Sequence, residues 1–150
     1  MLRKISRDNA RTPMQWSSGK NAGFTNGVPW LSVNQNYDRI NAESALKDKN
    51  SVFHYYRKLI RIRKANRTLI YGKYQLILGN NPVIYAYTRS LGREKIVVLL
   101  NFTTKNSKFK LPEYFRKKEL KLITGNYPNT KSEILRPYEA VVYSTTQKRF

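Results

Sequence analysis

The clearest strand pattern in the sequence is VIYAYTR at residues 83–89, followed by LGR at 91–93 and KIVVLLNF at 95–102. The two outer segments are rich in β-branched and aromatic residues, and the glycine between them is typical of a turn, so they predict neighbouring strands. Further runs of the same kind are Leu69–Leu78, Lys108–Leu111, Leu120–Thr124 and Ala140–Ser144. Residues 68–150 are therefore predicted to form an antiparallel β-sandwich domain.

The first part of the chain, residues 1–67, has a different pattern. Residues 6–50 lack sustained periodicity and are dense in Asn, Gly, Pro and Ser, which predicts one long loop. Loops longer than about 12–15 residues are usually functional or disordered, and the aromatic residues of this loop favour ordered packing. A helix capped by Asn50 or Ser51 and running to about Ala65 follows, with one apolar stripe: Val52, Phe53, Tyr56, Leu59 and Ile60. The predicted fold class is α+β.

The chain has 150 residues and a net charge of +20, from 29 basic and nine acidic side chains. Such a charge alone suggests a polyanionic partner. However, residues 1–67 carry 14 basic and four acidic groups, and residues 68–150 carry 15 and five, so each part contributes +10. This even distribution favours solvated surfaces over a specific nucleic-acid site, and salt-sensitive polyanion binding stays an alternative. No apolar run is long enough to span a bilayer, and no leader segment is recognisable, so a cytoplasmic protein is expected.

Several kinds of chemistry lack the necessary residues. The chain contains no cysteine and a single histidine, so a zinc site and a disulfide framework are not expected. Phosphate-binding glycine motifs are missing, and we expect no cofactor. His54 lies inside the predicted helix with no visible orienting partner, so a surface or core-edge position is a better interpretation than a general base.

The acidic residues include at most one candidate for the pair of carboxylates that glycoside hydrolysis uses. The nine carboxylates are mostly isolated among polar or basic neighbours, and only Asp8 stands in a segment that resembles a site. Glycoside hydrolysis needs two carboxylates about 5–10 Å apart in one cleft. The sequence offers at most one convincing member of such a pair.

One segment carries a family resemblance. It reads SRDNARTPMQW at residues 6–16, followed by NAGFT at 21–25 and PW at 29–30. This string resembles the signature of the α-amylase superfamily, glycoside hydrolase family 13, in the branch of oligo-1,6-glucosidases and α-glucosidases. The resemblance continues through the helix and through YAYTR at 85–89 and LRPYEA at 135–140, so it covers nearly the whole chain.

The resemblance implies that the long loop and the helix are the last loop and helix of a (β/α)8 barrel, and that the sandwich is domain C. A complete barrel takes about 250 residues, so the chain resembles only the C-terminal portion of such an enzyme. The family's nucleophile, acid/base and transition-state-stabilising carboxylates lie on earlier strands. No catalytic residue is therefore assigned here, and the isolated chain is expected to be inactive.

Residue roles follow from the same resemblance. Arg7 matches the arginine that reaches the substrate sugar, and a guanidinium suits this role because it presents fixed donors. We expect Asp8, Arg11, Trp16 and Trp30 to stabilise the loop. The substrate implied for the full-length parent is an α-glucosidic oligosaccharide.

Several alternatives stay open. Relatives commonly carry an acidic residue after MQW, but this chain has SSGK at residues 17–20, which is similar to the corresponding segment of trehalose-6-phosphate hydrolases. NAR at 9–11 is instead similar to the corresponding segment of oligo-1,6-glucosidases. A trehalose-6-phosphate hydrolase, a sucrose isomerase fragment, or a non-catalytic module that binds carbohydrate or a protein partner are the other interpretations. Without a barrel, the helix would expose its apolar stripe, which predicts self-association.

Overall fold

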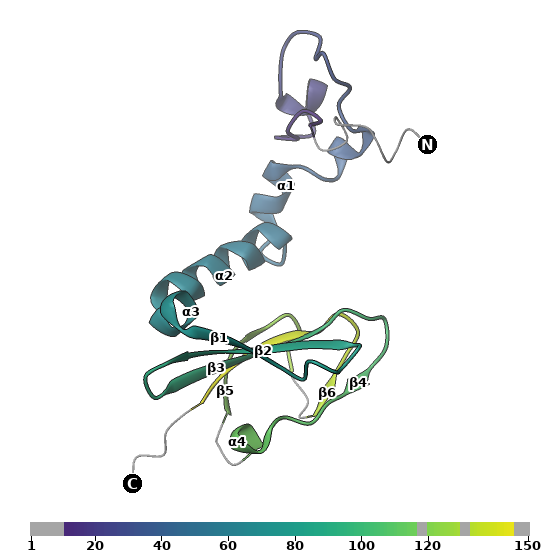
Figure 1. Ribbon diagram of the computed structural model, residues 1–150. Helices are drawn as coiled ribbons and strands as arrows, with labels where there is room; N and C mark the ends of the chain where they lie inside the picture. Colours follow the sequence, from purple (N-terminus) through teal and green to yellow (C-terminus); the bar gives the residue numbers. More distant parts are fainter. Residues whose placement is uncertain (1–10, 117–119, 130–132, 146–150) are drawn as a thin grey trace. The chain divides into compact units, whose positions relative to one another are not determined.

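The computed structural model describes residues 11–116, 120–129 and 133–145, and these form two compact units that divide between Ile62 and Arg63 (Figure 1). The first unit contains two 3-10 turns, η3 (Lys20–Gly23) and η4 (Gln35–Asp38), then α1 (Ala42–Lys47) and most of α2 (Val52–Ala65). The second unit begins with the end of α2 and α3 (Arg67–Tyr71) and contains all of the strands.

The second unit is built on a five-stranded antiparallel sheet in the order β1-β2-β3-β7-β5, and a two-stranded ribbon pairs β4 with β6. Its elements are β1 (Lys73–Ile77), β2 (Ile84–Leu91), β3 (Glu94–Asn101), β4 (Ser107–Lys108), α4 (Glu113–Arg116), β5 (Leu120–Gly125), β6 (Ile134–Leu135) and β7 (Ala140–Thr145). The predicted combination of helices with an antiparallel sheet is confirmed.

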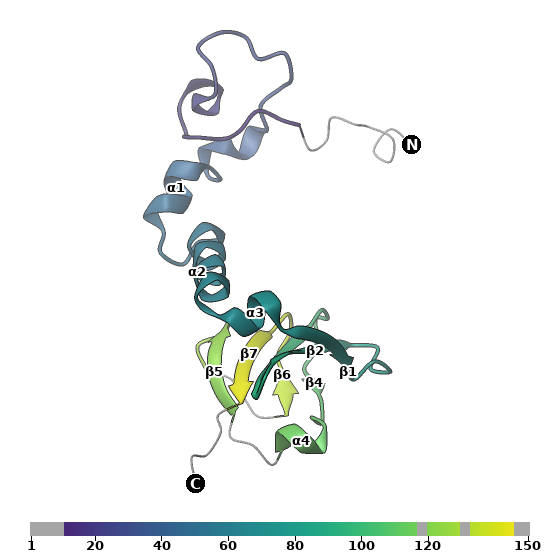
Figure 2. The same cartoon turned by 60° about the vertical axis from the view of Figure 1, so that its left-hand side comes forward.

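Strand alternation gives the five-stranded sheet two different faces. Leu99 pairs with Ala86 on one side and Val141 on the other, and all three side chains are buried on the inner face. Phe115 of α4 and Leu135 of β6 belong to the same apolar cluster, so these elements cover the inner face and form the second layer. The helix α3 contacts β2 and β3 from the outer face, as Figures 1 and 2 show.

Gly72 joins α3 to β1 at a point where the backbone leaves no room for a side chain. A Cβ atom there would lie 2.4 Å from the carbonyl oxygen of Thr68 and 3.0 Å from the backbone nitrogen of Ser90. Both are backbone atoms and cannot turn aside. A glycine therefore permits the close approach of this junction to the backbones of α3 and β2.

Three of the predicted elements were wrong in extent. Residues 42–47 are helical and not part of one continuous loop, because Asn41 accepts a hydrogen bond from the Ser44 backbone and caps α1. The strand predicted to begin at Leu69 begins at Lys73, because the Asn66 side chain accepts from the Leu69 backbone and starts the helix α3. The predicted strand Lys108–Leu111 is confined to Ser107–Lys108.

Candidate functional site

The segment that carries the family resemblance is held to α1 by its own backbone. The carbonyl oxygens of Gln15 and Trp16 accept hydrogen bonds from the backbone N–H groups of Ala42 and Glu43, at 2.9 and 3.0 Å. These are two of the N–H groups that a helix leaves without intrahelical partners. The Gln15 side chain donates to Asn36 Oδ1 and to the carbonyl of Ile40. This part of the loop is therefore ordered by hydrogen bonds between distant residues.

A tight turn at Asn21, Ala22 and Gly23 orders the next part of the loop. All three residues have positive φ, at 52°, 58° and 66°. The Ala22 carbonyl accepts from the backbone N–H groups of Trp16 and Ser17. The Asn21 amide donates to the carbonyls of Thr25 and Gly27, which accounts for an asparagine in the left-handed region.

The first unit contains an apolar hollow of about 560 Å³, which we call the loop groove. Its lining consists of Thr12–Trp16, Ile40–Ala42, Ala45, Leu46 and Phe53. None of these residues is ionisable, so the groove cannot donate or accept a proton in catalysis. Met14, Trp16 and Phe53 remain 49%, 55% and 43% exposed. The groove is therefore suited to receive other apolar groups.

The structure describes three of the five predicted site residues, Arg11, Trp16 and Trp30. Arg7 and Asp8 lie outside the described residues. Arg11 is exposed, and Trp16 borders the loop groove with its backbone hydrogen-bonded on both sides. Trp30 is 84% exposed. The structure thus brings Trp16 to the loop groove but does not join Arg11 or Trp30 to it.

The histidine connects two helices. Nε2 of His54 lies 3.0 Å from the carbonyl oxygen of Leu46, near the end of α1. The His54 ring also makes an edge contact with Phe53, and the His54 backbone donates to the Ser51 hydroxyl. Ser51 is therefore the capping residue of α2, as one of the two predicted candidates. The contacts of His54 are those of a residue that positions α2 on α1.

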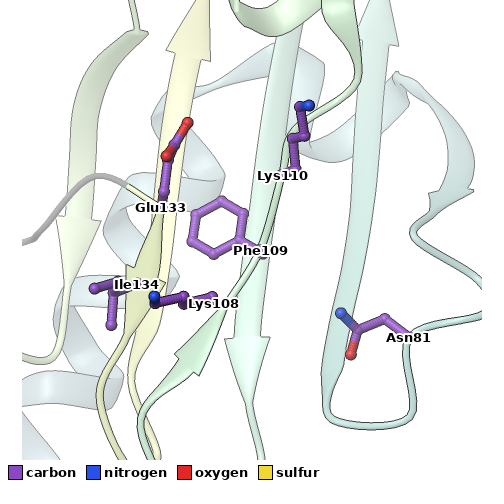
Figure 3. A pocket seen from close by; sticks show the side chains of 6 residues that line it. All are labelled: Asn81, Lys108, Phe109, Lys110, Glu133 and Ile134. Carbon is purple, nitrogen blue, oxygen red and sulfur yellow. The ribbon is translucent and has the colours of Figure 1, made fainter.

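The second unit has a hollow of about 860 Å³ beside β4 and β6, shown in Figure 3. It is lined by Asn81, Lys108, Phe109, Lys110, Glu133 and Ile134. The Phe109 backbone donates to the Glu133 carbonyl, which ties the two sides together. Among the described residues that line this hollow, Glu133 is the one carboxylate, so the two carboxylates that glycoside hydrolysis needs are not found among them.

Another hollow of about 560 Å³ lies on the outer face of the five-stranded sheet, and we call it the tyrosine–arginine hollow. Its residues are Arg63, Leu69, Tyr74, Tyr85, Tyr87, Arg89 and Leu100. Partial burial raises the pKa of Tyr87, a rise that the Tyr85 phenol reinforces and that the guanidinium groups of Arg89 and Arg63 oppose. The pKa of Tyr74 is raised by its hydrogen bond to Tyr85. The phenols of Tyr74 and Tyr87 therefore remain protonated near neutral pH.

An ion pair between the partly exposed Arg136 and the buried Glu139, which the sequence did not reveal, closes the loop before β7. Glu139 is 1% exposed and accepts from the Arg136 backbone, Nε and Nη2. The Arg136 guanidinium also lies 4.0 Å from the ring centroid of Tyr127. The Glu139 carboxylate raises the pKa of Arg136. In the sequence, the only indication of this pair was that Arg136 and Glu139 are three residues apart, and this spacing does not show that Glu139 is buried.

Asn101 plays a similar structural part at the end of β3. Its side chain donates to the carbonyls of Lys105 and Arg136 at 2.8 Å and accepts from the Thr103 backbone at 2.9 Å.

In the described part of the chain, no group of three His, Cys, Asp or Glu residues is arranged to hold a metal ion. Within the same residues, no helix is long and apolar enough to cross a membrane.

Comparison with known families divides the chain into two matches. Residues 1–72 match the model of the α-amylase catalytic domain, and residues 74–142 match that of the maltogenic amylase C-terminal domain. The order of the two matches agrees with the order of a loop and helix region followed by a β-domain.

Relatives and solved structures give the same result. The chain is 51% identical to an oligo-1,6-glucosidase of Parageobacillus thermoglucosidasius over 142 residues, which is 91% of this chain and 25% of the relative. The crystal structure of Bacillus licheniformis trehalose-6-phosphate hydrolase superposes with a TM-score of 0.89 at 39% identity, over 97% of this chain and 27% of that one. The isomaltulose synthase of Erwinia rhapontici gives 0.87 at 41% identity, with the same coverage of 97% and 27%. The chain thus spans about a quarter of the length of these proteins.

Proposed function

The chain belongs to the α-amylase family, glycoside hydrolase family 13, and we propose that it is the C-terminal portion of a retaining α-glucosidase. The observation that carries this proposal is the 51% identity to an oligo-1,6-glucosidase. In the proposed parent, residues 1–67 supply the last loop and helix of the (β/α)8 barrel, and residues 68–150 are domain C. The substrate is an α-glucosidic oligosaccharide, and the enzyme works in the cytoplasm.

The first unit supports a place within a larger barrel. Its loop groove exposes Met14, Trp16 and Phe53, and α2 exposes 83% of Val52 and 64% of Tyr56. Apolar surfaces of this kind are usually covered by another protein surface. In the parent, the rest of the barrel covers them. In the isolated chain they drive self-association.

The isolated chain is not expected to hydrolyse glycosides. Retaining enzymes use two carboxylates about 5–5.5 Å apart. Within the part of the chain that the structure describes, the residues lining the three hollows include at most one carboxylate per hollow. The chain contributes Arg7, which hydrogen-bonds sugar hydroxyls, while Asp8 and Arg11 hold the loop in place.

Two other proposals have observations in their favour. A trehalose-6-phosphate hydrolase or a sucrose isomerase as the parent is supported by the structural similarity to members of those two groups. A non-catalytic module is supported by the closed core of the second unit, which includes Leu99 and Val141. These candidates differ in the substrate that the assembled protein accepts.

A chimera tests the proposal. The chain replaces the corresponding quarter of the P. thermoglucosidasius enzyme, and hydrolysis of an α-1,6-linked glucose disaccharide is compared with hydrolysis of trehalose 6-phosphate. We expect the chimera to cleave the disaccharide and the isolated chain to cleave neither. Arg7→Lys should lower kcat/KM at least tenfold, because one bidentate charged hydrogen-bonding group contributes about 1.5–3 kcal/mol.

The matched control is Arg11→Lys, which should leave kcat/KM within about twofold because Arg11 is assigned to the loop and not to the sugar. Light scattering should show association of the isolated chain and a monodisperse chimera. Turnover by the isolated chain, or an inactive but folded chimera, would contradict the proposal.

A further inference from the structure

We propose that Asn26 is a site of spontaneous covalent modification, at which the chain itself converts an asparagine to aspartate and isoaspartate. The backbone nitrogen of Gly27 attacks the side-chain amide carbon of Asn26, the bond from that carbon to the side-chain nitrogen breaks, and ammonia leaves with the proton of the Gly27 N–H. Water then opens the resulting succinimide ring at either of its two carbonyl groups. Water is the co-reactant, and nothing is oxidised or reduced. This inference concerns the first unit alone and does not depend on the proposed function.

The residue that follows Asn26 leaves the attacking nitrogen uncrowded. No other asparagine of the sequence precedes a glycine. A side chain on the following residue would hinder the approach of its nitrogen to the amide carbon, and glycine has none. Among the described residues other than its chain neighbours, the nearest atom to a Cβ built on Gly27 is Thr25 Oγ1, at 3.7 Å. The approach to the nitrogen is therefore open.

The Asn26 side chain is accessible and is not held by its surroundings. Asn26, Gly27 and Val28 are all exposed, Val28 to 98%. Within the described part of the chain, the Asn26 amide makes no hydrogen bond. Asn21 of the same loop is the opposite case, because its amide donates to the carbonyls of Thr25 and Gly27. The Asn26 amide can therefore rotate toward the Gly27 nitrogen, and water can reach the succinimide.

The Thr25 hydroxyl restrains the attacking group. The Gly27 N–H donates to Thr25 Oγ1 at 3.1 Å. The nitrogen attacks after this N–H has lost its proton, and a hydrogen bond to the neutral form of a group disfavours its ionisation. Thr25 therefore slows the reaction at Asn26 without preventing it.

The isoaspartate product alters the loop more than the aspartate product does. Isoaspartate formation inserts the side-chain methylene carbon into the main chain between Thr25 and Gly27. The Asn21 amide donates to the carbonyls of these same two residues, at 3.0 and 2.8 Å, so a longer main chain separates the two acceptors. Asn21 then loses part of the restraint that keeps it at a positive φ of 52°. Aspartate leaves the main chain unchanged and adds a negative charge.

Peptide mapping by mass spectrometry tests the modification. The chain is incubated in mildly alkaline buffer, and conversion is followed at Asn26 and at Asn50, with isoaspartate identified by its labelling with an isoaspartyl methyltransferase. Asn50 is the internal control, because it is also exposed but precedes Ser51, whose N–H donates to the Asp48 carbonyl. We expect conversion at Asn26 to be at least about tenfold faster than at Asn50. Equal rates at the two asparagines would overturn the inference.

Two further conditions separate this site from a general reaction of asparagine. Gly27→Ala should abolish the excess conversion at Asn26, and circular dichroism should show an unchanged fold because the added Cβ has room. A rate that Gly27→Ala leaves unchanged would contradict the mechanism. The same incubation is repeated in urea. Conversion at Asn26 in urea alone would also overturn the inference, since the folded loop would then protect the amide.

A third variant tests the restraint by Thr25. Thr25→Val keeps the branched shape but removes the hydroxyl, and conversion at Asn26 should become about threefold faster, as expected for the loss of one hydrogen bond. Thr12→Val is the matched control in the same unit and should leave the rate unchanged. A slower reaction in Thr25→Val would show that the hydroxyl assists the attack and would contradict its restraining role.

Hydrogen exchange tests the effect on the loop. The backbone N–H groups of Trp16 and Ser17 donate to the Ala22 carbonyl, within the turn that Asn21 begins. Their exchange should be at least about threefold faster in the isoaspartate form, and Asn26→Asp, which mimics the aspartate product, should leave it unchanged. Equal exchange in the isoaspartate form and the unmodified chain would contradict the loosening of the loop.

Discussion

The two units of the chain use similar amino acids but bury them differently. In the second unit, Ile84, Val97, Leu99, Leu135 and Val141 are at most 2% exposed and form one cluster. In the described part of the first unit, only Pro13, Ala22 and Asn41 are buried, and the large apolar residues Trp16, Trp30 and Val52 are more than half exposed. The second unit thus has a core of its own, whereas the first is ordered mainly by backbone hydrogen bonds and capping side chains.

This difference shows which unit can be stable alone. Burial of apolar surface is the main favourable term in folding, and it contributes about 25 cal/mol for each Å² removed from water. The second unit obtains this term from contacts between its own strands. The first unit leaves the loop groove and much of α2 exposed, so a covering surface, such as the larger barrel that we propose, would add this term.

The largest expected effect comes from a core truncation in the second unit. Leu99→Ala removes a side chain that is 0% exposed and should destabilise the unit by about 2–5 kcal/mol, since it leaves a cavity. Leu46→Ala in the first unit is the matched control, and because Leu46 is 54% exposed its cost should be below about 1 kcal/mol. Urea unfolding followed by far-ultraviolet circular dichroism measures both. Equal costs would remove the proposed difference between the units.

A smaller effect is expected from glycine substitutions. Gly72→Ala places a Cβ atom 2.4 Å from the Thr68 carbonyl oxygen and should cost about 1–3 kcal/mol, because backbone must move. At Gly27 in the first unit, the nearest atom to an added Cβ is Thr25 Oγ1 at 3.7 Å, so Gly27→Ala should change stability by less than about 0.5 kcal/mol. Thermal unfolding of both variants is the measurement. A Gly72→Ala protein as stable as the parent chain would show that α3 is not closely packed.

The smallest effect concerns an exposed ion pair in α1. The Lys47 ammonium, 2.7 Å from Glu43, lowers the pKa of the Glu43 carboxyl below its ordinary value. A lowered folded-state pKa stabilises the helix above the unfolded-state pKa, and this stabilisation is lost as the pH falls through the folded-state pKa. In an NMR titration, Lys47→Met should raise the pKa of Glu43, whereas Lys20→Met should not change it. An unchanged pKa in Lys47→Met would show that the pair is not formed in solution.

Local signals in the sequence explain most of the helix boundaries, including those that were missed. The helix α1 has only six residues, too few for a periodic stripe, but Asn41 at its start and the pair of Glu43 and Lys47 were readable as a cap and an i,i+4 pair. Asn66 before α3 was a similar signal. The β-branched and aromatic residues of 68–78 favoured a strand over this helix, because the same residues can form a short helix or a strand.

Contacts between distant segments could not be predicted in the same way. β6 has two residues, and its pairing with β4 joins residues that are far apart in the sequence, Leu135 with Ser107 and Ile134 with Lys108. The tyrosine–arginine hollow needs the register of β1 on β2, the bend from α2 into α3, and the position of Arg63 at that bend. Neither the alternation of VIYAYTR nor the charge of Arg89 indicates which distant residues these side chains will contact.

By itself the sequence determined the family, the change from loop and helix to strands, and the segments of the central sheet, because turn residues, periodicity and a long motif act through neighbours along the chain. Which face of the sheet is closed and which is open depends on the packing of the elements against one another. The same is true of the ion pair between Glu139 and Arg136, and of Arg89, which donates to the Ile70 carbonyl and forms no ion pair with the described residues. Burial and pairing depend on side chains brought together from separate elements, and that proximity is a property of the packed chain.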